Sequence, residues 1–317
     1  MKTALAWAKS LAVERGALSD YLELTKPSVT SLILMSTLVG FYMGTRGSWS
    51  LLLLLHALVG FYMATQGPLR LGLLLGALLG TGLIAAGTAA LNHYLEIASD
   101  ARMRRTEQRP LPTGRLRPAQ ALAFGLALSA GGALYLALAV NRLTCALGLL
   151  TWASYLFLYT PLKRRTPLCT LVGAFPGALP ILMGWAAARG SLDPAGWLLY
   201  ALLFLWQFPH FFAIGWMYRE DYARGGIAML PVFDLPATAR QVVGFSLALL
   251  PVSLLPTALG MAGALYLCGA AVLGTAFLYC GVRLAVRRSA GEARRLLKAS
   301  VLYLPLLYAL LMLDKVP

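Results

Sequence analysis

Long apolar segments separated by short polar loops run through almost the whole chain. Nine of these segments are long enough to cross, as helices, a hydrocarbon core about 30 Å thick. They lie near residues 28–45, 71–95, 119–140, 143–161, 168–188, 195–217, 241–260, 262–282 and 297–313. The pattern predicts an all-α polytopic membrane protein, with a cytoplasmic segment at 1–27 and one transmembrane domain at 28–317.

The composition agrees with this prediction. Hydrophobic residues make up 59% of the chain, charged residues 12%, and the mean hydropathy is +0.71. An ordinary globular chain has roughly 45–50% apolar residues. The four cysteines are scattered without C-x-x-C spacing, which indicates small hydrophobic residues rather than metal ligands or disulfides. No cleaved signal peptide or long transit peptide is evident before Leu24, which favours a bacterial inner membrane.

The positive charge of the chain is concentrated in short loops. A net charge of +15 could suggest nucleic acid as a partner. However, the basic residues lie between apolar spans, which is typical of orientation by the positive-inside rule, so we expect membrane lipid and no nucleic acid. The N-terminus and the basic loops are predicted to face the cytoplasm and the C-terminus the outside; these loops are 101–117, 163–165, 219–240 and 283–298.

A local duplication adds one further apolar run. LVGFYMGT at 38–45 recurs as LVGFYMAT at 58–65, which leaves an extra apolar segment at 51–65. Its fifteen residues are short for a crossing, and one more crossing would place the basic loops or the N-terminus on the wrong side. We expect this segment to be re-entrant, to lie at the interface or to extend a neighbouring helix, with His56 as a bystander.

The most informative polar residues follow the second long span. Asn92, Glu96 and Asp100 are four residues apart, so they share one helix face at the cytoplasmic mouth. Carboxylates at the edge of a bilayer are costly unless they pair or coordinate. Mg²⁺ favours a few carboxylates plus phosphate oxygens, and Arg105 and Arg109 could clamp the same phosphates. The residues predict a diphosphate site.

The alternative for this stretch is a helix end without a ligand. In that case the carboxylates would pair with the neighbouring arginines, Arg102, Arg104 and Arg105.

A second polar group lies at 207–231. His210 falls inside an apolar segment and Asp221 lies at its cytoplasmic end. They are eleven residues apart, so they can share a helix face about 16 Å apart, and one end could serve a metal while the other serves a buried ring. The alternatives are a packed histidine bonded to a backbone carbonyl, and carboxylates paired with neighbouring arginines at the interface.

Cations also lie at two further entry points to the membrane. In YTPLKRRTPLCT, Pro161 is predicted to end one helix and Pro167 to start the next, around a basic turn at 163–165. The three cations of this turn set the topology, and at least one could reach a phosphate. Lys26 precedes the first span, where it would bind substrate or anionic lipid.

The chain resembles the membrane prenyltransferase superfamily typified by the 4-hydroxybenzoate polyprenyltransferases, and within it the branch that farnesylates protohaem IX. The resemblance spans most of residues 22–232 in order and spacing. It lies in the strings LTKPSVTSLIL, ALNHYLEIASDARMRRTEQRPLPTGRL, YTPLKRRTP, GALPILMGWAA, QFPHFFAIGW and YREDYARGGIAMLPV.

The resemblance implies an intramembrane enzyme with nine spans around a central cavity. Its reaction would join the farnesyl group of farnesyl diphosphate to a vinyl group of haem B, giving haem O, with Mg²⁺ as cofactor and a downstream haem A synthase as a possible partner. The implied Mg²⁺ and diphosphate residues are Asn92, Glu96, Asp100 and Asp221. The implied diphosphate contacts are Arg105, Arg109 and Lys163, with Lys26 as a further candidate, and His210 is implied on the haem side.

Three positions depart from the pattern of this branch: Ala98 replaces an Asp, Cys169 an Asn and Ala228 a Pro. Without the Asp at 98, Glu96 and Asp100 would carry the metal alone. Other functions left open are a prenyltransferase acting on a quinone precursor or a chlorophyll-type ring, a cation-coupled transporter using Glu96 and Asp221, and a non-catalytic haem chaperone.

Overall fold

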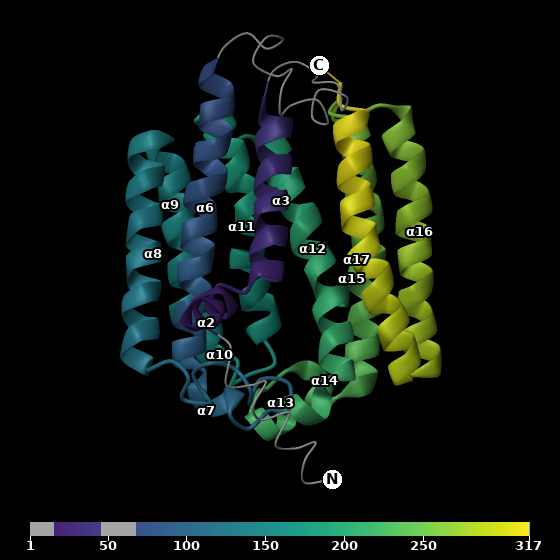
Figure 1. Cartoon of the computed structure of the whole chain (residues 1–317). Coiled ribbons are helices and arrows are strands. Elements are labelled where there is room, and N and C mark those ends of the chain that lie inside the picture. Colours follow the sequence, from purple (N-terminus) through teal and green to yellow (C-terminus); the bar gives the residue numbers. More distant parts are fainter. Residues whose placement is uncertain (1–15, 46–67, 317) are drawn as a thin grey trace.

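The computed structural model describes residues 16–45 and 68–316, and every regular element in these ranges is helical. The duplicated segment 51–65, with His56, lies outside the described residues. Figure 1 shows the long helices running roughly parallel, with the short helices at one end of the bundle. These short helices are α2 (Ala17–Leu24), α7 (Ile97–Asp100), α10 (Thr160–Leu162), α13 (Arg219–Gly225) and α14 (Leu230–Phe233).

The described part of the chain has nine helices that are long and apolar enough to cross a membrane, which confirms the predicted number. Five lie in the N-terminal part: α3 (Pro27–Gly44), α6 (Pro68–Leu95), α8 (Pro118–Ala139), α9 (Arg142–Ala153) continued to Leu162, and α11 (Cys169–Arg189). Four follow: α12 (Pro194–Met217), α15 (Leu235–Ala258), α16 (Ala264–Arg287) and α17 (Ala290–Leu313). Contacts of α11 with α12 and of α3 with α17 join the two groups.

The last three spans are longer at the basic end than predicted. The segment 283–298 is not a loop, because α16 continues to Arg287 and α17 begins at Ala290. The Oγ of Ser289 accepts a hydrogen bond from the amide of Glu292 at 3.3 Å and caps α17. Long basic side chains at helix ends can extend their charged heads beyond the hydrocarbon, so these helices tolerate arginine in their terminal turns.

The helix that contains Pro161 ends one residue later, at Leu162, close to the predicted end. The helix passes through a π-helical turn, Ser154–Tyr159, and continues to Leu162. Proline lacks an N–H and disrupts a regular α-helix, and a π-helical turn changes the local hydrogen-bond register. The Oγ1 of Thr160 donates to the carbonyl oxygen of Tyr155 at 2.9 Å, which supports this turn. The next helix, α11, begins at Cys169, after Pro167.

Glycines allow close backbone packing of the helices that carry polar residues to the basic end. A Cβ at Gly184 of α11 would clash with the carbonyl oxygen of Thr37 on α3. A Cβ at Gly87 of α6 would lie 2.7 Å from the carbonyl oxygen of Gly125 on α8. Small residues at such contacts are typical of membrane helices. This packing fixes the position of Lys26 at the start of α3 and of Asn92 near the end of α6.

Candidate active site

Three polar segments far apart in the sequence meet at the basic end of the bundle. The amide of Ala228 donates to the carbonyl oxygen of Lys163 at 2.6 Å. The amide of Arg104 donates to Oδ1 of Asp221 at 3.2 Å. The sulfur of Cys169 lies 3.9 Å from the carbonyl oxygen of Ala228, so two of the positions that depart from the family pattern contact each other. The predicted motifs therefore share one end of the molecule and are in direct contact.

Asn92 anchors a fourth segment, the start of α3. Its Oδ1 accepts a hydrogen bond from Nζ of Lys26 at 2.7 Å, and its Nδ2 donates to Oγ1 of Thr160 at 3.3 Å. Lys26 has a left-handed backbone, φ 47°, immediately before Pro27. Left-handed backbone at a residue other than glycine is uncommon and tends to occur where the surrounding structure enforces it. Here the left-handed residue is Lys26 itself, whose side chain bonds Asn92 at the end of α6.

The buried carboxylates each pair with a cation, Glu96 with a distant lysine and Asp100 with an arginine nine residues later. Nζ of Lys163 lies 2.8 Å from Oε1 of Glu96, and Nη1 of Arg109 lies 2.7 Å from Oδ2 of Asp100. Glu96 is 8% exposed and Asp100 1%. A buried carboxylate is tolerated when it is paired and hydrogen-bonded. These partners are not the arginines expected for a simple helix end, namely Arg102, Arg104 and Arg105.

Ala98 explains why the missing Asp leaves this cluster intact. The residue is exposed, whereas Ser99 and Asp100 beside it are buried. A carboxylate at position 98 would therefore start from the solvent side of α7.

Burial and neighbouring charges shift the pKa values of the ionisable groups here. Burial, together with the charge of Arg109, lowers the pKa of Lys26 to about 7. Burial alone would raise the pKa of Glu96, but the charges of Lys163 and Lys26 outweigh it and hold that pKa below its usual value. Burial likewise opposes the charge on Lys163, yet Glu96 raises its pKa well above the usual range. The pair is thus ionised at neutral pH, and the charge of Lys26 depends on what binds beside it.

Several buried polar atoms of this helix end lack a hydrogen-bond partner among the described residues. They are both ring nitrogens of His93, Oγ of Ser99 and Oδ1 of Asp100, and none of the three residues is more than 2% exposed. Buried polar groups are normally hydrogen-bonded, and an unpaired one is costly. Four unpaired atoms within eight residues indicate that this surface of the helix end binds a polar ligand.

Sequence reasoning missed His93. The signal was available, because His93 and Asp100 are seven residues apart, two helical turns, and so share a face.

Asp221 holds the loop that follows α7. Besides the amide of Arg104, its carboxylate accepts from the amide of Arg105 and pairs with the side chain of Arg224. These bonds lower the pKa of Asp221 against the effect of burial. Within the described ranges, no group of three or more His, Cys, Asp or Glu side chains gathers closely enough to hold a metal ion. Asp221 therefore does not join Glu96 and Asp100 in a three-carboxylate cluster in this structure.

Arg105 is positioned by aromatic rings of the second motif. Its guanidinium carbon lies 5.5 Å from the ring centroid of Tyr218 and 5.9 Å from that of Tyr222. Such cation–π contacts hold a guanidinium in place while leaving its N–H groups available. Burial raises the pKa of the Tyr222 hydroxyl, against the opposing charges of Arg105 and Lys163, so it stays protonated.

His210 lies inside the membrane on α12 and not in the charged cluster. Its Nδ1 is 2.8 Å from Oγ of Ser300, and its ring stacks on Trp206 with 4.7 Å between centroids. The Ser300 hydroxyl donates to the carbonyl oxygen of Leu297 at 2.7 Å, so it accepts from Nδ1 of His210. Nε2 of His210 then carries the free lone pair. The partner is a hydroxyl and not the backbone carbonyl considered from the sequence.

The site suits a polyanion whose remainder is apolar. Lys26, Lys163 and Arg109 supply positive charge at the mouth of an apolar bundle. The oxygens of Asn92, Glu96 and Asp100 are the hard ligands that Mg²⁺ prefers, and Oδ1 of Asp100 has no partner among the described residues. Together the fold and the site define a membrane-spanning helical protein with a buried charged cluster at one end of its bundle.

The chain belongs to the UbiA prenyltransferase family, whose family profile matches residues 53–304. It is 54% identical to a protoheme IX farnesyltransferase of Solibacter usitatus, over 93% of this chain and 98% of that protein. It is 45% identical to a protoheme IX farnesyltransferase of Koribacter versatilis, over 94% of both chains.

Solved structures show the same fold at low sequence identity. A digeranylgeranylglyceryl phosphate synthase structure matches with a TM-score of 0.73 at 16% identity, covering 94% of this chain and 98% of that one. A UbiA homolog from Archaeoglobus fulgidus bound to DMAPP and Mg²⁺ matches with a TM-score of 0.63 at 16% identity, covering 92% and 99%. The predicted all-helical fold of nine spans is confirmed, and the chain is a multi-pass membrane prenyltransferase.

Proposed function

We propose that this chain transfers the farnesyl group of farnesyl diphosphate to a vinyl group of protoheme IX, haem B, and so makes haem O. The relatives that match at 54% and 45% identity carry the name protoheme IX farnesyltransferase. The observation that carries the proposal is the buried cluster at the end of α6. There, paired carboxylates and cations surround polar atoms that have no partner among the described residues.

The cations of the cluster bind the diphosphate in this proposal. Arg109 and Lys163 give up part of their pairing with Asp100 and Glu96 and donate to phosphate oxygens, with Arg105 and Lys26 as further donors. Donors fixed in a water-poor site stabilise the charge that develops on a leaving group more strongly than the same donors in water. Their prior pairing holds the side chains in position before substrate arrives.

His93 adds a further donor at this end of α6. Its ring is buried and both of its nitrogens lack a partner among the described residues, so a ring N–H is available to a phosphate oxygen. Ser99 can donate its hydroxyl in the same way.

Asn92, Glu96 and Asp100 would hold Mg²⁺ together with the diphosphate. When bound, Mg²⁺ neutralises phosphate charge and assists departure of the diphosphate. The UbiA homolog from Archaeoglobus fulgidus was solved with DMAPP and Mg²⁺, which supports this assignment. Asp221 acts differently, because it fixes the loop that presents Arg104 and Arg105.

The transfer itself needs no protein nucleophile. The bond between the farnesyl C1 and its oxygen breaks, and the electron pair leaves with the diphosphate. The π electrons of the vinyl group then form the new carbon–carbon bond. Water adds to the resulting cation and loses a proton, which gives a hydroxyethylfarnesyl side chain. The apolar interior delays capture of the farnesyl cation by water.

His210 lies on the acceptor side in this proposal. Nε2 carries its lone pair because Nδ1 is bonded to Ser300, and it is therefore suited to the iron of the haem substrate. Trp206, stacked on the His210 ring, restricts its rotation.

We also propose that the cluster faces the cytoplasm of a bacterium, across the inner membrane. The basic residues of 101–117, 163–165 and 283–298 all lie at that end of the helices. The N-terminal side of α3 lies there too, as predicted for a cytoplasmic N-terminus.

The test is an assay with purified protein. Given Mg²⁺, farnesyl diphosphate and haem B, the protein is expected to make a more apolar haem that reversed-phase chromatography resolves. Parallel reactions with 4-hydroxybenzoate test the quinone-precursor alternative. No product with haem, or product only with 4-hydroxybenzoate, would contradict the proposed acceptor.

A further inference from the structure

A cavity lies at the same end of the bundle as the buried charged cluster. Its volume is about 410 Å³, and it opens between the α12–α13 corner and the turn from α16 to α17. Its lining residues are Arg104, Trp216, Met217, Tyr218, Arg219, Glu220, Asp221, Arg224, Arg288 and Ala290. Asp221 and Arg104 connect it to the diphosphate site, but Lys26, Lys163 and Arg109 do not line it.

The charge of this cavity suits a dianion. Four arginines face two carboxylates in its lining, which leaves two positive charges in excess. One arginine, Arg224, is paired with Asp221. Arg104 and Arg219 form no ion pair with any residue in the described ranges, although Glu220 and Asp221 lie beside them. Their guanidinium groups are free to bind an anion bidentately.

Arg288 reaches the cavity from a strained backbone position. Its φ is 47°, and it is the single residue between the end of α16 and the N-cap of α17, Ser289. Left-handed backbone at a residue other than glycine costs energy and is concentrated at ligand-binding sites. Glycine or asparagine adopts this left-handed conformation at lower cost than arginine. The conformation of the turn therefore does not explain why position 288 is an arginine.

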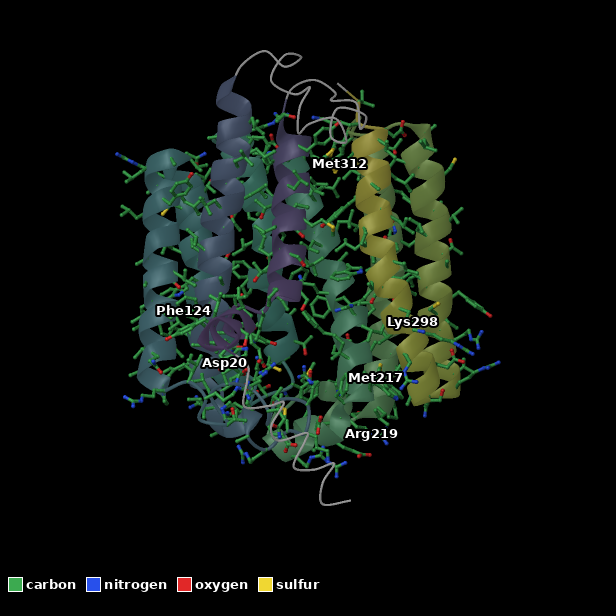
Figure 2. The ribbon with its side chains drawn as sticks, viewed as in Figure 1. Asp20, Phe124, Met217, Arg219, Lys298 and Met312 are labelled. Atoms are coloured by element: carbon green, nitrogen blue, oxygen red, sulfur yellow. The ribbon has the colours of Figure 1, made fainter. Side chains whose placement is uncertain are left out.

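Part of the lining of the cavity comes from α12, the helix that also carries His210. The lining residues on α12 are Trp216, which is 2% exposed, and Met217. Met217 and His210 are seven residues apart, so they share a face of α12 about 10 Å apart. On the opposite side, α17 contributes Ala290 to the cavity and Ser300 to the hydrogen bond with His210. Figure 2 shows Met217 at the lower end of α12, with Arg219, the first residue of α13, below it.

We infer that this arginine cavity, defined by Arg104, Arg219, Arg224 and Arg288, binds the two carboxylates of the tetrapyrrole acceptor. The inference rests on the proposed function, because haem B carries two propionates on one edge of an apolar ring. The carboxylates occupy the arginine cavity, the ring extends along α12 and α17 toward His210, and the vinyl-bearing part is directed into the protein. This orientation separates the anionic groups of the two substrates.

The excess of two charges favours an acceptor with two carboxylates over a single lipid phosphate. Glu220 and Asp221 also line the cavity and would repel a phosphate that was not held by several arginines at once. An anionic lipid headgroup is the competing occupant, and the experiment separates the two.

The experiment compares haem B with its dimethyl ester, in which both propionates are neutral. The variants are Arg219→Gln and Arg288→Gln, singly and together. Arg240→Gln is the matched control, because Arg240 is an exposed arginine at the same end of α15 that does not line the cavity. The assay measures KM for the acceptor and for farnesyl diphosphate, in nanodiscs with and without phosphatidylglycerol.

Each single variant is expected to raise KM for haem B about ten-fold, because a hydrogen bond between charged groups is lost. KM for farnesyl diphosphate stays at the wild-type value, which also shows that the variants fold. For the dimethyl ester, KM is expected to be higher than the wild-type KM for haem B and to be the same in wild type and variants, because the ester has no carboxylate for the arginines to bind.

Three results would overturn the inference. The first is a KM for haem B that is unchanged in the variants. The second is a KM for the dimethyl ester that the variants raise as much as they raise the KM for haem B. The third is a defect that appears only when phosphatidylglycerol is present. The last would assign the cavity to lipid. Failure of the proposed function itself looks different, since the wild-type protein would then make no product from either acceptor.

Discussion

Two clusters of buried ion pairs lie at the same end of this protein, one around Glu292 and the other at the end of α6, and they differ in how they are built. In the α16–α17 cluster, Glu292 is 4% exposed, and its Oε1 accepts from Arg283 at 2.8 Å and from Arg295 at 2.7 Å. Both arginines come from the same helical hairpin. Local pairing accounts for Glu292 in this hairpin, where one buried atom, Nε of Arg283, has no partner among the described residues.

The cluster at the end of α6 draws its cations from three separate segments. Lys26 comes from the start of α3, Lys163 from the α10–α11 turn and Arg109 from the loop after α7. It also buries atoms that no described residue satisfies, including both nitrogens of His93. Paired buried charge is therefore not in itself the mark of a site, whereas convergence of distant segments on unsatisfied polar atoms is.

The largest expected effect tests the role of the α6 cluster in catalysis. Asp100→Asn or Arg109→Gln is expected to lower kcat by roughly 10²- to 10³-fold, because groups that stabilise the leaving-group charge are lost. Steady-state turnover with farnesyl diphosphate and haem B measures this, with size-exclusion chromatography as the check on folding. Turnover within a few-fold of wild type in either folded variant would remove that residue from the site.

His93 tests whether unsatisfied polar atoms mark the substrate. His93→Leu is expected to raise KM for farnesyl diphosphate about ten-fold, because the phosphate loses a donor in a buried site. His93→Gln keeps an N–H and should lose less. KM for haem is the internal control, and an equal rise in both KM values would indicate a general disturbance of the structure.

Lys26 gives a smaller, pH-dependent effect. Its pKa is lowered to about 7 without substrate, and a bound diphosphate favours the protonated form. Binding therefore takes up a proton above pH 7, so affinity for farnesyl diphosphate should fall several-fold between pH 7 and 8. Lys26→Arg stays charged and should show a flatter profile, leaving only the titration of the diphosphate itself. Identical profiles would contradict the role of Lys26.

The smallest effect on activity is expected at the comparison cluster. Glu292→Gln should lower the melting temperature, because Arg283 and Arg295 would lose their partner. Its KM for farnesyl diphosphate should stay at the wild-type value. Thermal unfolding and steady-state kinetics on the same preparation measure both. A stable protein with impaired diphosphate binding would show that the two clusters are not as different as proposed.

Hydropathy predicted the spans well, because each crossing needs about twenty apolar residues whatever its neighbours are. Hydropathy predicted the helix ends less well, at the places where helices leave the hydrocarbon. Arginines at 283–298 were assigned to a loop, although a helix can continue while its basic side chains reach water. The helix end predicted at Pro161 is close to the observed end at Leu162, but hydropathy gives no sign of the π-helical turn at Ser154–Tyr159.

For the site, spacing along one helix was enough to bring Asn92, Glu96 and Asp100 together. Their partners were harder to predict. Glu96 and Lys163 are 67 residues apart in sequence, so their pairing depends on how whole helices pack. The hydrogen bonds of Asp221 with the backbone amides of residues 104–105 could not be predicted either, because no sequence pattern near Asp221 indicates them.

The most direct test of the central claim is binding of farnesyl diphosphate in the absence of acceptor. Isothermal titration calorimetry with Mg²⁺ compares wild type, Arg109→Gln and Glu292→Gln in the same detergent. Wild type and Glu292→Gln are expected to bind alike, Arg109→Gln is expected to bind at least ten-fold more weakly, and a chelator should weaken binding to wild type. Equal binding by Arg109→Gln and wild type would contradict the central claim.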